Sequence, residues 1–98
     1  TGVPVKDTIK IKNEENFVKK TLDRDQLVAV QTPQAFSFSL IKKAHEQVSK
    51  DAKISDDASL VEEYGHPVKV IKSSYENIKI TTPDDLLQAK LILKRRKE

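Results

Sequence analysis

The chain has 98 residues, of which 37% are hydrophobic and 5% aromatic, and it contains no Cys, Met or Trp. A chain of this length supports one small domain with a thin core, and the absence of cysteine excludes disulfide scaffolds, thiol catalysis and cysteine-based zinc sites. Eighteen Lys and Arg against fifteen Asp and Glu give a formal charge of +3, which is too small and too mixed to indicate a nucleic-acid surface by itself.

Residues 3–30 have the pattern of a long β-hairpin. Between residues 3 and 12 the apolar side chains fall on odd positions, which is the period of a half-buried strand. Residues 13–16 are polar and predict a turn, and apolar residues return between 17 and 30. Because an isolated two-stranded ribbon is only marginally stable in water, we expect this arm to pack on something else.

Pro33 ends the strand pattern, since proline cannot donate to a sheet ladder. A helix is then predicted over residues 36–48, where apolar side chains recur at steps of three and four. Either Ser37 or Ser39 can cap its N-terminus.

A second helix is predicted to begin at Ser55 or Asp56, either of which can cap it. Gly65 is suited to the left-handed conformation that ends many helices, and so predicts where this helix stops. Alternating apolar residues then predict short strands at residues 68–71 and 78–80, separated by a turn.

The last predicted element is a helix that begins at Thr82, and its apolar face extends to Leu93. Thr82 is a strong N-cap and Pro83 stands at the first helical position. Two aspartates follow, and their negative charge is favoured at the positive end of the helix dipole.

Lys79 is the first candidate functional residue. It alternates with Ile78 and Ile80 on its predicted strand and therefore points to the opposite face. A solvated strand face explains this placement most simply, since lysine is mostly exposed. The alternative is a ligand-binding cation, because ligands of α/β proteins bind at the carboxyl ends of strands, where a lysine can offset charge on a phosphoryl group.

The other polar clusters have ordinary structural explanations. Arg24, in the sequence TLDRDQL, can form a surface ion pair or hold a phosphate bidentately, and this feature alone favours the ion pair. Asp56 and Asp57 fit helix capping better than a paired-carboxylate site. His45 and His66 lack a second ligand at metal spacing, and the terminal KRRKE segment fits the last turn of a helix.

Five short segments occur in an order that is more specific than any one of them: VPVKDTIK, TLDR, VQTPQAF, SDDASLVE and NIKITTPDDL. This succession resembles the C-terminal part of the 2-C-methyl-D-erythritol 4-phosphate cytidylyltransferase family. The resemblance implies an α/β fold, namely the C-terminal portion of a Rossmann-like nucleotidyltransferase fold with a projecting β-hairpin arm, short strands and three helices. It also implies that residues 1–98 are a fragment of one such domain, with 3–30 as a dimerisation and substrate arm and 31–98 completing the α/β core.

The family transfers a cytidylyl group from CTP to 2-C-methyl-D-erythritol 4-phosphate and releases pyrophosphate, in non-mevalonate isoprenoid biosynthesis. The resemblance therefore implies these two substrates, an assisting Mg²⁺ ion, and a homodimer in which the β-arm reaches the partner's active site. The sequence has no apolar run of membrane length and no secretory signal. We thus expect a cytoplasmic enzyme that binds neither membrane nor nucleic acid.

Five residues receive roles from their places in the family's motifs. Lys79 of the NIK motif is implied to be catalytic, contacting the phosphates and stabilising the transition state. Thr8 of the DT motif and Arg24 of the DR motif are implied to bind methylerythritol phosphate across the dimer. Thr32 of the TPQ motif is implied to lie at the substrate site, and Ser55 keeps a substrate-contacting hydroxyl where the family commonly has a threonine.

The family's glycine-rich loop has no counterpart here, since the only glycines are Gly2 and Gly65. The base-recognition segment and the metal-binding aspartate have no counterpart either, because in the family they lie upstream of the part that this chain resembles. We therefore expect a cut piece of a longer enzyme, with no metal site of its own and no cytidylyltransferase activity alone. Two alternatives stay open. One is a fragment of a ribitol-5-phosphate cytidylyltransferase, which shares the fold and several motifs, and the other is a non-catalytic dimerisation module built from the arm.

Overall fold

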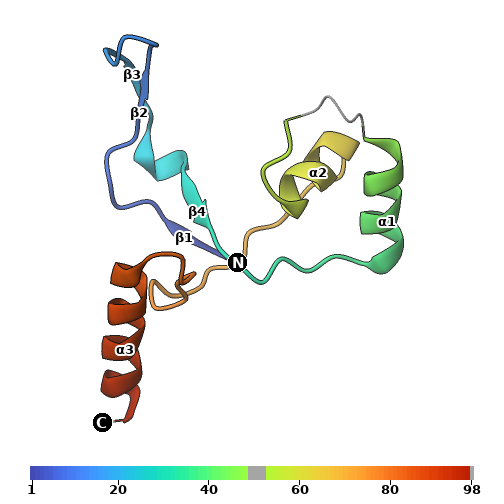
Figure 1. Ribbon diagram of the computed structural model, residues 1–98. Helices are drawn as coiled ribbons and strands as arrows, with labels where there is room; N and C mark the ends of the chain where they lie inside the picture. The colour runs from blue at the N-terminus through green and yellow to red at the C-terminus, as the bar shows by residue number, and fades with distance from the viewer. Residues whose placement is uncertain (49–52, 98) are drawn as a thin grey trace. The chain divides into compact units, whose positions relative to one another are not determined.

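The computed structural model describes residues 1–48 and 53–97, and the chain divides into two compact units. The first unit comprises Thr1–Thr32 and Lys72–Glu98, and the second comprises Pro33–Ile71. The predicted α/β composition, with three helices and short strands, is confirmed. The elements are β1 (Gly2–Pro4), β2 (Lys10–Lys12), β3 (Val18–Thr21), the 3₁₀ helix η1 (Arg24–Gln26), β4 (Val28–Val30), α1 (Phe38–Gln47), α2 (Asp57–Tyr64) and α3 (Pro83–Lys97) (Figure 1).

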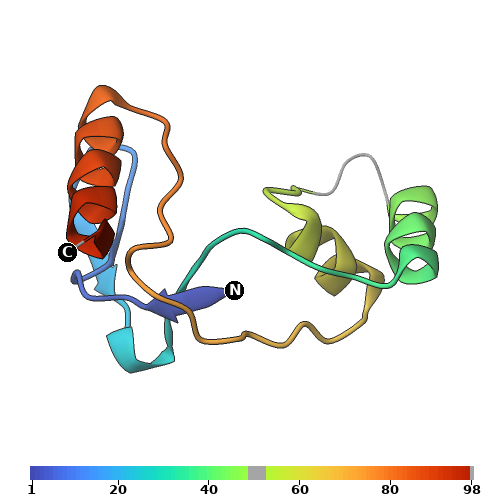
Figure 2. The same ribbon diagram turned by 90° about the horizontal axis from the view of Figure 1, so that it is seen from below.

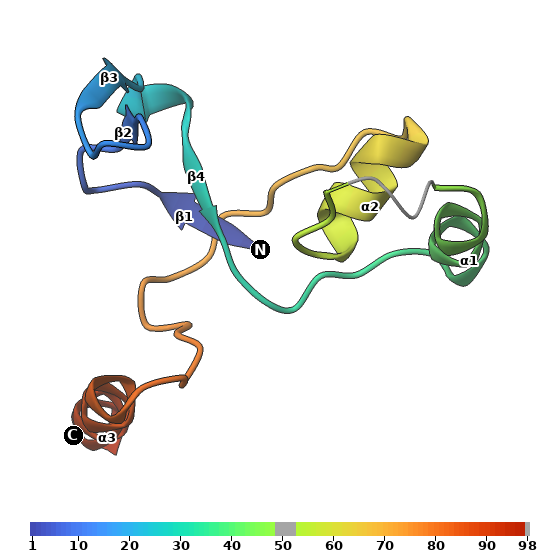
Figure 3. The same ribbon diagram turned by 45° about the horizontal axis from the view of Figure 1, so that its top comes forward.

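Four short strands form two antiparallel ladders within residues 2–30. β1 pairs with β4, so that Gly2 faces Val30, and β2 pairs with β3, so that Lys10 faces Thr21. The β2–β3 pair lies beyond the β1–β4 pair along the same stretch of chain (Figure 3). The second ladder contains a register shift, which is the usual sign of a β-bulge.

The turn predicted at residues 13–16 is confirmed, and one asparagine organises it. The side-chain oxygen of Asn13 accepts the backbone N–H groups of Glu15 at 2.9 Å and Phe17 at 3.0 Å. Asn16 has a φ of 70°, a left-handed conformation that asparagine tolerates better than most residues.

The strands predicted at residues 68–71 and 78–80 do not form in the described part of the chain, so this prediction is wrong. The nearest pairing is an isolated parallel bridge between Gly2 and Lys72, next to a 2.9 Å hydrogen bond from the Ser73 N–H to the Gly2 carbonyl. Alternating apolar residues make a strand only where a neighbouring strand completes their backbone hydrogen bonds. None of the described strands pairs with either segment.

The second unit is a pair of helices packed around a small core (Figures 1 and 2). Ala44 of α1 and Val61 of α2 are both 0% exposed, and Leu60 completes the buried cluster. Six partly buried side chains pack against it, and they belong to Phe36, Leu40, Ile41, Val48, Tyr64 and Val68. Val68 is therefore used to cover the helices rather than to build a sheet.

Both helices of this unit were predicted, and the structure selects their caps. Ser37 caps α1, because its hydroxyl accepts a first-turn N–H at 3.3 Å, whereas Ser39 lies inside the helix. Asp56 caps α2, because its carboxylate accepts the Ser59 N–H at 2.7 Å. Gly65 ends α2 in the left-handed conformation, as predicted.

The last helix is also confirmed, and it begins with a reciprocal cap. The Thr82 hydroxyl accepts the Asp85 N–H at 3.2 Å, and the Asp85 carboxylate accepts the Thr82 N–H at 3.0 Å. α3 runs to Lys97, so the cations of the terminal basic run lie in its last turn, where the helix dipole favours them.

Most of the apolar side chains of α3 are exposed. Ile92 is 9% exposed, whereas Leu91 is 69% exposed, and Leu86, Leu87 and Leu93 are exposed as well. Within the described residues, no helix combines the length and the apolar character that crossing a bilayer requires.

We predict that Gly65→Ala lowers the free energy of unfolding by roughly 1–2 kcal/mol. Gly65 has a φ of 101°, and a Cβ built there would meet nothing within 4 Å, so the cost comes from backbone strain and not from a clash. Urea unfolding followed by circular dichroism measures this change. Gly65→Asn is the matched control and should keep more of the stability, because asparagine tolerates the left-handed region. Equal stability of Gly65→Ala and the wild type would contradict the prediction.

Candidate functional site

Side-chain amides join two segments of the first unit that lie far apart in the sequence. The Asn77 side-chain N–H group donates to the Thr32 carbonyl at 2.8 Å and to the Gln31 side-chain oxygen at 3.4 Å. The Gln31 side-chain N–H group donates to the Ser74 carbonyl at 3.0 Å. We call these four residues the amide clasp. The clasp holds the VQTPQ segment against the loop that leads to Lys79.

Hydrogen-bonding chemistry fixes the orientation of both amides in the clasp. A backbone carbonyl only accepts, so the Asn77 atom that faces Thr32 must be the nitrogen. The same argument places the Gln31 nitrogen toward Ser74, which leaves its oxygen facing Asn77. Both amides are half-buried, so losing a partner would leave a polar group poorly solvated.

Tyr75 ties the same loop to the beginning of the chain. Its hydroxyl donates to the Pro4 carbonyl at 2.7 Å, and the Lys6 ammonium lies 4.9 Å from the centre of its ring. The Arg24 guanidinium donates to the Lys6 carbonyl at 2.8 Å. A chain of contacts therefore runs from Arg24 through Lys6 to Tyr75 within the first unit.

Lys79 lies on an unpaired segment, not on the strand predicted for it. Its side chain is exposed and makes no hydrogen bond or ion pair with any residue in the ranges 1–48 and 53–97. Ile78 is half-buried but Ile80 is 56% exposed, so the predicted alternation of faces holds only in part. The segment is bounded by the clasp at Asn77 and by the cap of α3, where Asp85 accepts three bonds in all, two from Thr81 and one from the Thr82 N–H.

Three other predicted site residues belong to the same unit. Arg24 starts η1 and is exposed, and Thr8 is exposed in the loop between β1 and β2. Thr32 is exposed, and its carbonyl is engaged by the clasp.

Ser55 lies in the second unit, beside the cap of α2. Its hydroxyl is 3.0 Å from the Ser59 hydroxyl. Gln34 supports the same helix end, because its amide donates to the Asp56 carboxylate at 3.0 Å and accepts the Ala58 N–H at 3.0 Å. The hydrogen bonds from Ser59 and then from Gln34 lower the pKa of Asp56 below its ordinary value.

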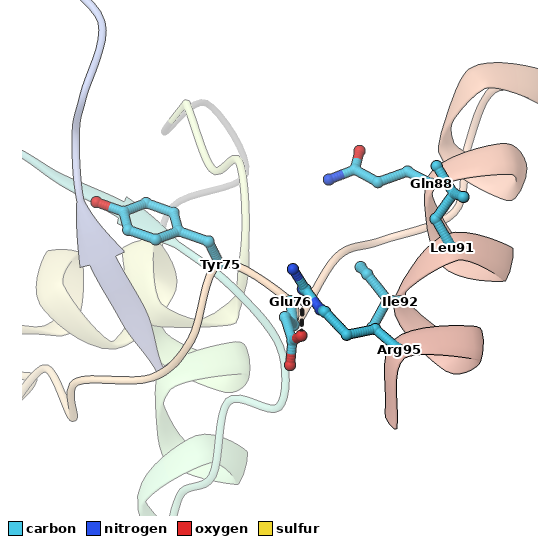
Figure 4. A pocket seen from close by; sticks show the side chains of 6 residues that line it. All are labelled: Tyr75, Glu76, Gln88, Leu91, Ile92 and Arg95. Carbon is cyan, nitrogen blue, oxygen red and sulfur yellow. Dashed lines mark hydrogen bonds and ion pairs between the residues drawn. The ribbon is translucent and has the colours of Figure 1, made fainter. Parts of the chain in front are cut away.

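A pocket lies between the 75–76 loop and one face of α3 (Figure 4). Glu76 accepts hydrogen bonds from Arg95 and, at 3.3 Å, from Arg96, and Arg95 together with Gln88 and Leu91 lines the α3 side. The bond from Arg95 is the main cause that lowers the pKa of Glu76. The two arginines of the KRRKE segment are thus matched to a carboxylate, which agrees with a structural role.

The structure places Thr8, Arg24, Thr32 and Lys79 in one unit and Ser55 in the other. The sequence analysis missed Gln31, Asn77, Tyr75 and Gln34, which support these residues. The available signal was the pair of glutamines around Thr32 and Pro33, because glutamine has both a donor and an acceptor with which to bridge segments.

Acidic and imidazole side chains are the groups that could hold a metal here, since the chain contains no cysteine. Among the described residues no three of them come together in a group that could hold an ion. His45 lies 3.6 Å from Asp57, an exposed contact between α1 and α2. The Asp56 carboxylate is occupied by the helix cap, so Asp56 and Asp57 serve α2, as predicted.

The sequence matches one family of known enzymes. A model of the family described as 2-C-methyl-D-erythritol 4-phosphate cytidylyltransferase matches residues 1–95. The protein of that name from Geobacillus thermodenitrificans is 57% identical over 96 residues, which are 97% of this chain and 42% of the relative. The one from Alkaliphilus oremlandii is 55% identical over 98 residues, covering 99% of this chain and 42% of the relative. The chain thus spans about two fifths of the length of these curated relatives.

Solved structures give the same result for the fold. The 4-diphosphocytidyl-2C-methyl-D-erythritol synthase of Anaerococcus prevotii has a TM-score of 0.81 and 38% identity, over 95% of this chain and 44% of that one. The cytidylyltransferase of Thermus thermophilus has a TM-score of 0.78 and 34% identity, over 95% of this chain and 46% of that one. The chain therefore has the fold of the corresponding part of these enzymes.

We predict that Asp56→Asn weakens the loss of stability in acid. The pKa of Asp56 is lower in the folded chain than its ordinary value of 3.8, so its ionised form stabilises the fold above that pH, and this contribution is lost as the pH falls through the folded pKa. Asparagine still caps the helix but does not titrate. Urea unfolding at a series of pH values between about 7 and about 3 measures the difference.

Ser59→Ala is the graded companion variant, because it removes the hydroxyl that contributes most to the shift. Its acid dependence should lie between those of the wild type and Asp56→Asn. If all three proteins lose stability in parallel as the pH falls, the cap does not carry the effect.

Proposed function

The chain belongs to the 2-C-methyl-D-erythritol 4-phosphate cytidylyltransferase family, and we propose that it acts as the C-terminal part of an enzyme of this activity. The proposed reaction transfers a cytidylyl group from CTP to 2-C-methyl-D-erythritol 4-phosphate. A phosphate oxygen of the acceptor attacks the α-phosphorus of CTP, a new P–O bond forms, and the bond to the β-phosphate breaks to release pyrophosphate. The enzyme would serve non-mevalonate isoprenoid biosynthesis in the cytoplasm.

The observation that carries this proposal is the exposed positive charge of Lys79. Its ammonium is exposed and has no carboxylate partner among the described residues, and its backbone lies between two hydrogen-bonded anchors. A cation held in this way can offset the charge that develops on phosphate oxygens during transfer. For nucleotidyl transfer, a protein mainly has to position the two substrates and to stabilise this charge.

We assign the acceptor substrate to the remaining predicted residues. Arg24 can hold phosphate oxygens with its planar guanidinium, and its present partner is a neutral carbonyl that leaves its charge available. The hydroxyls of Thr8, Thr32 and Ser55 are exposed donors of the kind that orient a phosphate or a polyol.

We propose that the ladders within residues 3–30 form the dimerisation arm and carry Thr8 and Arg24 to the active site of a second subunit. Ile11, Phe17 and Val18 of this region are 44%, 67% and 59% exposed, so an apolar surface is available for a partner. The second subunit would give the ribbon the packing that an isolated ribbon lacks.

We further propose that the chain completes a Rossmann-like nucleotidyltransferase fold in the longer enzyme. Relatives are more than twice as long as this chain, and the additional length can supply the rest of that fold. A family Mg²⁺ ion would be bound outside the described residues, because these offer no fitting set of ligands. This chain's own part is to bind, orient and neutralise phosphate.

We predict that Lys79→Ala in the full-length enzyme lowers kcat by about 100-fold or more, the range seen when one electrostatic stabiliser is removed. Release of pyrophosphate from CTP and methylerythritol phosphate is the measurement. Lys90→Ala is the matched control, since Lys90 is an exposed lysine of α3, and it should keep the wild-type rate. A wild-type rate in Lys79→Ala would remove Lys79 from the mechanism.

We predict that the 98-residue chain alone releases no pyrophosphate from the two substrates. It holds one strong candidate for charge stabilisation and no glycine-rich segment with which to cradle a triphosphate. The assay uses the purified chain at high concentration, with the full-length enzyme as the positive control. Turnover by the chain itself would show that it contains a complete active site.

A further inference from the structure

We propose that Asn77 is a positioning residue for Lys79: its side chain fixes the backbone that carries Lys79 relative to Thr32, so that cation and substrate hydroxyl keep one geometry. This inference rests on the proposed function and concerns a residue to which no substrate contact is assigned. It adds a requirement to the site, because a correctly placed charge needs the amide clasp as well as the lysine.

The backbone around Lys79 lacks the usual means of fixing a strand-end residue. No described strand pairs with residues 78–80, and the lysine side chain makes no hydrogen bond or ion pair with any described residue. Its position therefore depends on the anchors on either side. Downstream the anchor is the cap of α3 at Thr82 and Asp85, and upstream it is Asn77.

Among the hydrogen bonds of the described residues, the one from the Asn77 side chain is the bond that connects this segment to Thr32. The backbone bonds near it are local, since the Asn77 N–H donates to the Ser74 carbonyl at 3.0 Å and the Ile78 N–H to the Glu76 carbonyl at 2.9 Å. The side-chain bond to Thr32 spans 45 positions of sequence at 2.8 Å. Gln31 supports the same junction from the other side through Ser74.

Asn77→Asp is the sharpest test because it keeps the shape of the side chain and removes both donors. A carboxylate facing the Thr32 carbonyl repels it instead of binding it, so the segment must move. In the full-length enzyme we expect kcat to fall by about 10- to 100-fold, the loss that a displacement of about 1 Å causes. The KM for CTP should stay close to the wild-type value, because the displaced residues are assigned to the acceptor and to the transition state.

A double-mutant cycle separates positioning from a merely structural role. If Asn77 acts through Lys79, then Asn77→Asp should cause little further loss of kcat in the Lys79→Ala background. If the fold loss of kcat in the double variant equals the product of the losses in the two single variants, Asn77 acts independently of Lys79 and the inference is overturned. A wild-type kcat in Asn77→Asp would overturn it as well.

Two further variants keep the test decisive. Gln47→Glu makes the same change from amide to carboxylate at an exposed position of α1 and should leave kcat unchanged. Gln31→Leu removes the bond to Ser74 at similar side-chain size, and it replaces Asn77→Asp in the cycle if that variant does not fold. It is then expected to show the same dependence on Lys79, and full multiplicativity there would also overturn the inference.

The outcome of Lys79→Ala alone distinguishes the two proposals. If that variant keeps the wild-type rate, the proposed function of Lys79 fails and the positioning role falls with it. If Lys79→Ala is slow while Asn77→Asp is not, the function stands and the positioning role alone is wrong.

Discussion

The hydrogen bond from the Asn77 amide to the Thr32 carbonyl is the constraint on which the geometry of the first unit depends. It joins segments 45 positions apart, and the neighbouring bond from Gln31 to Ser74 reinforces it. The Tyr75 hydroxyl then donates to the Pro4 carbonyl, so the loop at residues 74–77 is bonded both to β1 and to the segment that follows β4. Each of these contacts uses a backbone carbonyl as acceptor, which fixes main-chain positions independently of the side chains that the carbonyl-bearing residues carry.

Polar contacts carry so much of the geometry because little apolar surface is buried. The buried hydrophobic residues of the described chain are Val3, Ala44, Ala58, Leu60, Val61 and Ile92, and three of them form one cluster between α1 and α2. A leucine such as Leu91 at 69% exposure leaves an apolar face of α3 without the packing that normally stabilises a helix. This pattern occurs in a chain that spans about two fifths of the length of its relatives.

Local chemistry made the helices predictable, whereas pairing could not be read from the sequence. Asp56, Gly65 and Thr82 specify helix ends by hydrogen bonds within a few residues, and each lies where its chemistry indicated. The strands at 68–71 and 78–80 required neighbours that no local pattern reveals. The candidate site divides in the same way: motif order singled out Lys79 and Thr32, but the amides that join their segments reach across tens of residues and carry no local periodicity.

The cations of the first unit differ in whether a carboxylate lies beside them, and the sequence alone does not show this difference. The densest basic run is at the C-terminus, yet Arg95 and Arg96 face Glu76, whose carboxylate cancels part of their field. Arg24 faces only a neutral carbonyl, and Lys79 has no ion pair within the described residues, so both keep the charge that a phosphate would meet. Attraction for a dianion depends on this uncompensated charge and on how firmly it is held, not on how many basic residues are adjacent. If the chain serves the proposed reaction, Lys79 meets both conditions, because its charge is uncompensated within the described residues and its backbone lies between two hydrogen-bonded anchors.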